Sequence, residues 1–284
     1  MKRKGVRLSH ERPSFQIFIV IWVTFCLAFS FLSIWITFIN SMKTDYEVAY
    51  NVFSLPSSQI FSAIATNYSK AWNEIYPYFL RSILSSLLCG FFVTLFAAIL
   101  AYILVFKDFY FKHLFFMFFI SILLVPSIIG FPTLLPLIRD TFNLGDTIFG
   151  YTLPTIGGAW VMGMFLFRTF FFQQPKAIYE SAKLDGANDI QIFLRITIPL
   201  ALPIMLYYAI GIFSSEYNDY LWASLVLDNK LTLMPKMYSL VDSNTLTYGA
   251  MYAMYMLSSV PLVITTVISM HYFRSGEFSS GMKL

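Results

Sequence analysis

The chain has 284 residues, of which 58% are hydrophobic and 12% are charged. Soluble domains carry about 25% charged residues, so this composition, with a mean hydropathy of +0.68, indicates a protein that crosses a membrane several times. The net charge of +4 is small and does not suggest a nucleic-acid partner. Cys26 and Cys89 lie inside apolar stretches and lack the spacing of a metal site or a disulfide framework.

The N-terminus combines a basic segment, residues 1–14, with an uncharged apolar run at 15–39. The apolar core of a signal peptide has about 7–15 residues and is followed by small residues at a cleavage site. The run here is longer and no such site follows it. We therefore expect a cytoplasmic N-terminus and a retained first transmembrane helix.

Six stretches reach the length of about 20 apolar residues that a bilayer-spanning helix needs. They are 15–39, 82–106, 114–138, 148–172, 198–225 and 249–273. Irregular backbone cannot face lipid, and the runs are continuous rather than alternating, so helices are favoured over a β-barrel. The predicted fold class is an all-α polytopic membrane protein with six transmembrane helices. A long extracytoplasmic loop, 40–81, separates the first helix from a core at 82–284.

The distribution of Lys and Arg predicts the orientation of these helices. With the N-terminus inside, the inner segments carry roughly twice as many Lys and Arg residues as the outer ones, as the positive-inside rule requires. Both termini are then cytoplasmic, and so is the segment 175–203.

Residues 175–203 form the longest polar interval in the second half of the chain. Lys176, Glu180 and Lys183 share one helical face, and the dipeptide Asp185-Gly186 is typical of a turn because glycine adopts positive φ. A second short helical face follows. We interpret this segment as a helix–turn–helix at the membrane surface that presents a short helix outside the bilayer.

Two membrane segments carry features of a transport pathway. Pro126, Pro132 and Pro136 predict a bent third helix, which could line a pathway or simply pack with a kink. In the fifth, Glu216 and Asp219 share a face and could line a polar path or form a gate, or could meet water if the helix leaves the bilayer near Ser214. The candidate solute contacts are Glu216, Asn218, Asp219, Tyr220 and Trp222, because aromatic faces, amides and carboxylates suit sugar rings; packing or gating is the alternative.

No residue pattern predicts chemistry by this chain. The spacing of Gly145 and Gly150 matches a phosphate-binding loop, but Tyr151 and Thr152 stand where Lys and Ser or Thr are required. The three histidines are far apart in sequence, and no catalytic constellation has the necessary spacing. We expect neither catalytic residues nor a metal site.

The segment from residue 180 to residue 199 also matches a known pattern. Permease subunits of bacterial ABC importers carry a cytoplasmic Glu-Ala-Ala, three residues, Gly, nine residues and Ile-x-Leu-Pro. The corresponding residues are Glu180-Ser181-Ala182, Gly186, and Ile196-Thr197-Ile198-Pro199. Ser181 replaces Ala and Ile198 replaces Leu, and both replacements are mild. The chain thus resembles these permease subunits.

Further residues resemble the carbohydrate branch of that family. The run 184–187, Leu-Asp-Gly-Ala, is similar to that branch's Ile-Asp-Gly-Ala, and 217–222, Tyr-Asn-Asp-Tyr-Leu-Trp, is similar to its motif of Trp, Asn, Asp or Glu, Phe or Tyr, and Leu or Phe. The tail 279–284 resembles the ending of maltose-permease G-type subunits, with departures at several positions.

The resemblance implies a type I ABC importer permease fold and a division of labour. Two permease subunits, a heterodimer by the family tendency, would pair in the bacterial cell membrane. Two cytoplasmic ATPase subunits would bind ATP and Mg, so this chain would hold no cofactor, and an extracytoplasmic binding protein would deliver a sugar or oligosaccharide. The loop 175–199 would contain the coupling helix, and its docking residues would be Glu180, Ser181, Ala182, Asp185, Gly186, Ala187, Ile196 and Pro199.

Two alternatives remain open from the sequence. A self-sufficient secondary transporter or channel would show internal repeats and midplane charges, and neither is evident. An ABC permease for a solute other than a sugar would carry the same docking motif.

Overall fold

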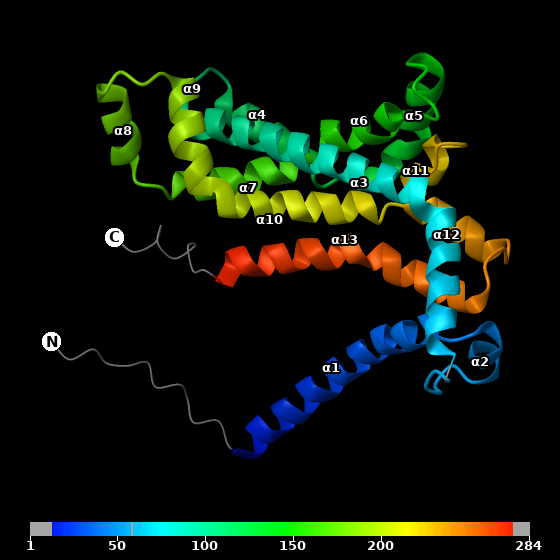
Figure 1. Ribbon diagram of the computed structural model, residues 1–284. Helices are drawn as coiled ribbons and strands as arrows, with labels where there is room; N and C mark the ends of the chain where they lie inside the picture. The colour runs from blue at the N-terminus through cyan, green and yellow to red at the C-terminus, as the bar shows by residue number, and fades with distance from the viewer. Residues whose placement is uncertain (1–12, 58, 275–284) are drawn as a thin grey trace. The chain divides into compact units, whose positions relative to one another are not determined.

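The computed structural model describes residues 13–57 and 59–274, and every regular element in these ranges is a helix. The chain divides into two units, which are treated separately. Unit 1 holds the residues up to 73 together with 245–257, and unit 2 holds 74–244 and the residues from 258 onward. Figure 1 shows the course of the chain. The predicted all-α fold class is confirmed; the tail 279–284 lies outside the described residues.

Five helical stretches are long and apolar enough to cross a bilayer. They are Phe15–Ser41, Ile60–Phe106, Ile148–Phe172, Asp189–Tyr217 and Tyr248–Met270. Two shorter pieces, Lys112–Ile122 and Ser127–Thr141, pass the same test together and meet at 88°, which gives a sixth candidate span. The number of spans predicted from the sequence therefore agrees with the described part of the chain.

The third span is broken rather than kinked. Helix α4 (Lys112–Ile122) ends in a turn before Pro126, whose ψ of 127° is not helical. The chain then continues through the 3-10 turn Ser127–Gly130, α5 (Phe131–Pro136) and the π-helical turn Leu137–Thr141. Proline lacks the N–H that would continue the helical ladder, which explains why the break falls there.

Two helix boundaries differ from the spans expected from hydropathy. Helix α3 (Ile60–Phe106) begins inside the loop expected at 40–81 and continues without interruption through Pro77. Helix α10 (Ile198–Tyr217) ends before the predicted residue 225, and a separate helix, α11 (Leu221–Val226), follows. Asp219 lies one residue before the N-cap Tyr220, and its carboxylate accepts hydrogen bonds from the backbone N–H groups of Trp222 and Ala223 at 3.3 and 3.0 Å, which satisfies donors in the first turn of the new helix.

Unit 1 contains α1 (Pro13–Ser41), α2 (Asp45–Tyr50), and the first parts of α3 and α13 (Tyr248–Arg274). The fully buried Lys43 ties the end of α1 to the segment after α2. Its Nζ donates to Asn40 Oδ1 at 3.0 Å and to the carbonyls of Asn51 and Val52 at 3.1 and 3.0 Å, which satisfies all three of its donors. Burial lowers the pKa of Lys43, although the charge of the nearby Glu47 carboxylate opposes this effect.

Unit 2 contains the remaining helices. Those not yet given are α6 (Ile148–Gly158), α7 (Trp160–Phe172), α8 (Lys176–Leu184), α9 (Asp189–Ile192) and α12 (Leu233–Asp242), with a π-helical turn at Phe193–Thr197. Within unit 2, α8 lies at one end and α5 and α11 lie at the other (Figure 1). Unit 2 therefore extends from α8 to the region of α5 and α11.

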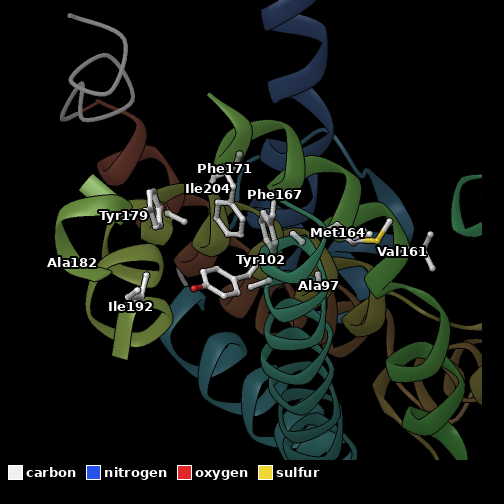
Figure 2. Close-up of a cluster of buried hydrophobic side chains, with 14 residues drawn as sticks. Ala97, Tyr102, Val161, Met164, Phe167, Phe171, Tyr179, Ala182, Ile192 and Ile204 are labelled. Carbon is white, nitrogen blue, oxygen red and sulfur yellow. The ribbon is translucent and has the colours of Figure 1, made fainter. Parts of the chain in front are cut away.

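The main buried cluster of unit 2 draws side chains from α3, α7, α8, α9 and α10, as Figure 2 shows. Small residues allow close helix packing: a Cβ added at Gly163 of α7 would clash with the Tyr208 ring and lie 2.8 Å from the Ala97 methyl group of α3. Tyr179 and Ala182 of α8 belong to the same cluster. The short helix α8 is thus packed against the core of unit 2 through these two side chains.

Candidate functional site

The end of α8 has the geometry of a Schellman motif. The N–H of Ala187 donates to the Ala182 carbonyl at 3.0 Å, and the N–H of Gly186 donates to the Lys183 carbonyl at 3.1 Å. Gly186 has φ of +82°, the left-handed conformation that this motif requires and that glycine adopts without steric cost. The turn predicted from Asp185-Gly186 is therefore present.

Helix α9 begins with a capping box directly after this turn. Asn188 Oδ1 accepts from the Gln191 N–H at 2.9 Å, and Gln191 Oε1 accepts from the Asn188 N–H at 3.0 Å. Asp189 forms an ion pair with Lys107, which follows α3, at 2.5 Å. These contacts fix the direction of α9 relative to α3, so the two short helices form one ordered element.

One face of this element packs into the core. The Tyr179 ring lies 4.1 Å, centroid to centroid, from the Phe106 ring at the end of α3, and its hydroxyl donates to Gln174 Oε1 at 2.7 Å. Burial raises the pKa of Tyr179, so this hydroxyl stays neutral and keeps donating. Ile192 of α9 is also buried against the same cluster.

The opposite face is exposed, but it carries only some of the docking residues expected from the sequence. Glu180, Ser181, Asp185, Gly186 and Pro199 are exposed. Ala187 and Ile196 are half-buried, and Ala182 is buried, so its small size serves packing within unit 2 rather than the approach of a partner.

The docking residues expected from the sequence do not include two strongly exposed apolar residues. Leu184 is 89% exposed and Ile190 is 70% exposed, on either side of the Gly186 turn. A large apolar side chain that falls outside the buried stripe of an amphipathic helix was the available signal. We call the exposed set Glu180, Ser181, Leu184, Asp185 and Ile190 the docking surface.

The residues predicted to line a solute path occupy different environments. Glu216 is buried in α10, and its backbone carbonyl accepts from the Tyr151 hydroxyl at 3.0 Å. Trp222 is buried, and its Nε1 donates to the Tyr151 carbonyl at 3.1 Å. Asp219 caps α11, as described above. The side chains of Asp219 and Trp222 are hydrogen-bonded within unit 2, whereas Glu216 is buried with its Oε1 lacking a hydrogen-bond partner among the described residues.

The other two candidates face outward. Asn218 is exposed, and its side-chain amide donates to the Ser214 carbonyl at 2.7 Å. Tyr220 is 41% exposed, with its ring 5.1 Å from the ring of Tyr238. A role in solute transfer stays a prediction for all five. No group of three or more His, Cys, Asp or Glu side chains suited to a metal ion occurs in 13–57 and 59–274.

Comparison with known proteins decides the family. Residues 90–276 match the profile of the family described as "Binding-protein-dependent transport system inner membrane component". The chain belongs to this family. It is a transport subunit of an ABC importer and a multi-pass protein of the cytoplasmic membrane. This membership favours the importer hypothesis over a self-sufficient transporter or channel.

Relatives are similar over most of their length. The diacetylchitobiose uptake system permease protein NgcG of Streptomyces coelicolor is 30% identical over 233 residues, which are 79% of this chain and 75% of that protein. The arabinooligosaccharides transport system permease protein AraQ of Bacillus subtilis is 29% identical over an alignment of length 294 that covers 97% of this chain and 99% of that protein.

A solved structure shares the fold. A chain of a bacterial ABC transporter involved in the import of the acidic polysaccharide alginate superposes with a TM-score of 0.75 at 21% identity, covering 93% of this chain and 99% of that one. The type I importer permease fold expected from the sequence is confirmed.

Proposed function

We propose that this chain is one of two permease subunits, a heterodimer, of an importer for a sugar or oligosaccharide. Two separate cytoplasmic ATPase subunits bind ATP and Mg and drive it, and an extracytoplasmic binding protein delivers the solute. Both termini lie in the cytoplasm. The named solutes of NgcG and AraQ, diacetylchitobiose and arabinooligosaccharides, support the carbohydrate class.

The docking surface carries the proposal for ATPase coupling. Its residues are exposed, although the helices that bear them are packed into the core of unit 2, α8 through Tyr179 and Ala182 and α9 through Ile192. An exposed apolar pair, Leu184 and Ile190, flanked by charged residues is typical of a protein-binding surface. Movement of a bound ATPase would therefore pass to α3 through packed side chains rather than through a free loop.

The test is a pair of substitutions in the assembled importer. Leu184→Asp places a charge in the docking surface, and we expect solute-stimulated ATP hydrolysis to fall at least tenfold with the ATPase lost on purification. Tyr110→Asp is the matched control, because Tyr110 is 92% exposed in the turn after α3 and lies outside the docking surface. Equal activity in the two variants would refute the assignment of this surface.

For the solute path, we propose that Asn218 and Tyr220 contact the solute while Glu216, Asp219 and Trp222 position them. The exposure of the first two and the packing of the last three support this division. Tyr220→Ala should raise the solute concentration needed for half-maximal uptake while ATPase binding stays intact. Unchanged uptake in Tyr220→Ala and in Asn218→Ala would remove both residues from the path.

A further inference from the structure

A cavity of about 310 Å³ lies in unit 2 where α3, the start of α6 and the segment before α12 meet. It is lined by Arg81, Thr147, Ile148, Phe149, Tyr151, Leu227, Lys230 and Thr232. Arg81 and Phe106 are separated along α3 by about 37 Å at 1.5 Å per residue, so the cavity is remote from the docking surface. None of the five predicted solute-path residues lines it.

The start of α6 supplies backbone donors to this cavity. Thr147 is the N-cap, and its Oγ1 accepts from the Gly150 N–H at 3.0 Å. Ile148 and Phe149, the first two residues of this 11-residue helix, have no hydrogen-bond acceptor for their N–H groups in the described part of the chain. Both residues line the cavity, and a helix start favours negative charge.

Two cations line the same cavity. Arg81 Nη1 makes one long hydrogen bond, 3.4 Å, to the Leu231 carbonyl, which leaves most of its five donors available. Lys230 is exposed, and its Nζ has no ion pair or hydrogen bond within residues 13–57 and 59–274. No carboxylate lines the cavity, so the two positive charges are not neutralised there.

The nearby acids are engaged elsewhere. Asp146 accepts from the backbone N–H groups of Asp228, Asn229 and Lys230 at 3.1, 3.0 and 2.8 Å. The Asp228 carboxylate pairs with Arg139 at 2.7 Å. These contacts hold the backbone of the 228–230 segment in place and so position Lys230 at the cavity.

The Thr232 side chain is an independent observation that points to a ligand in this cavity. It is 3% exposed, and its Oγ1 is buried without a hydrogen-bond partner among the described residues. It stands at the N-cap of α12 but makes no side-chain capping hydrogen bond, and the Leu233 N–H donates to Ser82 Oγ at 2.8 Å. The hydroxyl is therefore free to donate to a ligand in the cavity that Thr232 lines.

We propose that this cavity binds an oxyanion, specifically a phosphate or phosphodiester group. The group would accept from the N–H groups of Ile148 and Phe149, from the Thr232 hydroxyl and from Arg81, with Lys230 at its open side. Charge-assisted hydrogen bonds of this kind are typical of phosphate sites. The group could belong to an anionic phospholipid headgroup or to a free phosphate compound, and the site does not depend on which solute the importer carries.

Two measurements on the full chain distinguish these sources. Thermal unfolding in detergent is followed while inorganic phosphate is added at constant ionic strength, and retained phosphatidylglycerol is counted by native mass spectrometry after reconstitution in mixed-lipid nanodiscs. Stabilisation by phosphate identifies a site open to free anions. Selective retention of phosphatidylglycerol without stabilisation by phosphate identifies a lipid headgroup site.

In either case, we expect Lys230→Gln and Arg81→Gln to weaken binding at least tenfold and Thr232→Val to weaken it about threefold. Lys236→Gln is the matched control, since Lys236 lies on α12 outside the cavity and faces Glu74 at 3.8 Å. The proposal is overturned if neither ligand binds, or if Lys230→Gln and Lys236→Gln behave alike. If Arg81→Gln does not fold, the Lys230→Gln and Thr232→Val variants test the proposal.

Discussion

At the scale of single residues, Gly186 determines the geometry of the docking turn. Its φ of +82° costs an ordinary L-residue about 1–2 kcal/mol, and no heavy atom lies within 4 Å of the position that a Cβ would take. The constraint is therefore on backbone conformation and not on space. Asparagine tolerates this conformation better than other non-glycine residues.

Gly186→Asp should abolish solute-stimulated ATP hydrolysis in the assembled importer while membrane insertion stays normal. The substitution adds a charge beside Asp185 in the docking surface, and its backbone cost is small because Asp, like Asn, is among the residues that adopt positive φ. Gly186→Asn is the control, because it keeps the turn without the charge and should retain part of the activity. ATPase assays on purified complexes give the answer, and normal coupling in Gly186→Asp would contradict the role assigned to the turn.

Asp146 predicts a pH dependence of stability. Partial burial pushes its pKa upward, but the N–H donors of Lys230, Asn229 and Asp228 outweigh this and lower the pKa. Because the pKa of Asp146 is lower in the folded state than its unfolded value of about 3.9, the ionised carboxylate stabilises the folded protein at pH values above about 3.9. This stabilisation is lost as the pH falls through the folded-state pKa.

Asp146→Asn should therefore destabilise unit 2 by about 1–2 kcal/mol at pH 7. Asparagine also tolerates the residue's φ of +53°, so the backbone is not strained by the change. Thermal unfolding between pH 3 and pH 7 measures the effect, and the difference between wild type and variant should shrink toward pH 3. A constant difference across this range would show that the charge of Asp146 does not stabilise the fold.

At the scale of elements, the two faces of α8 explain what the sequence could predict. The turn at Asp185-Gly186 was predictable because it depends on local backbone preferences. The burial of Ala182 and the exposure of Leu184 were not, because they depend on where the end of α3 lies. The same holds for Asp219, whose capping role requires knowing that α10 ends at Tyr217.

The ring contact between Tyr179 and Phe106 predicts how α8 is held. Tyr179→Ala should detach α8 from the core and increase hydrogen exchange across 176–184, with a loss of solute-stimulated ATP hydrolysis. Tyr179→Phe removes only the hydrogen bond to Gln174 and should cost about 0.5–1.5 kcal/mol with coupling retained. Protection of 176–184 that is the same in Tyr179→Ala as in wild type would disprove the anchoring.

At the scale of the whole molecule, hydropathy predicted the number of spans but not the break in the third. Counting apolar residues measures length, whereas the 88° bend before Ser127 depends on where Pro126 interrupts the hydrogen-bond ladder. The docking surface and the cavity lined by Arg81, Lys230 and Thr232 lie at opposite ends of the part of α3 that belongs to unit 2. The proposed topology therefore places them on opposite sides of the membrane.

Cysteine labelling in intact cells tests that topology. With Cys26 and Cys89 replaced by Ala, a membrane-impermeant maleimide should label Asn229→Cys from outside and should label Tyr110→Cys only after the cells are opened. Both positions are exposed and lie outside the docking surface, so a bound ATPase does not cover them. Labelling of Tyr110→Cys in intact cells would invert the proposed orientation.

The uninterrupted course of α3 through unit 2 has a mechanical consequence. The stretch of α3 from Arg81 to Phe106 is about 37 Å long, and it contacts the Tyr179 ring at one end and the Leu231 carbonyl at the other. A rotation of about 10° around its midpoint would displace each end by about 3 Å in opposite directions. A movement of α8 that turned this stretch of α3 as a rigid body would thus displace Arg81 by as much as it displaces Phe106.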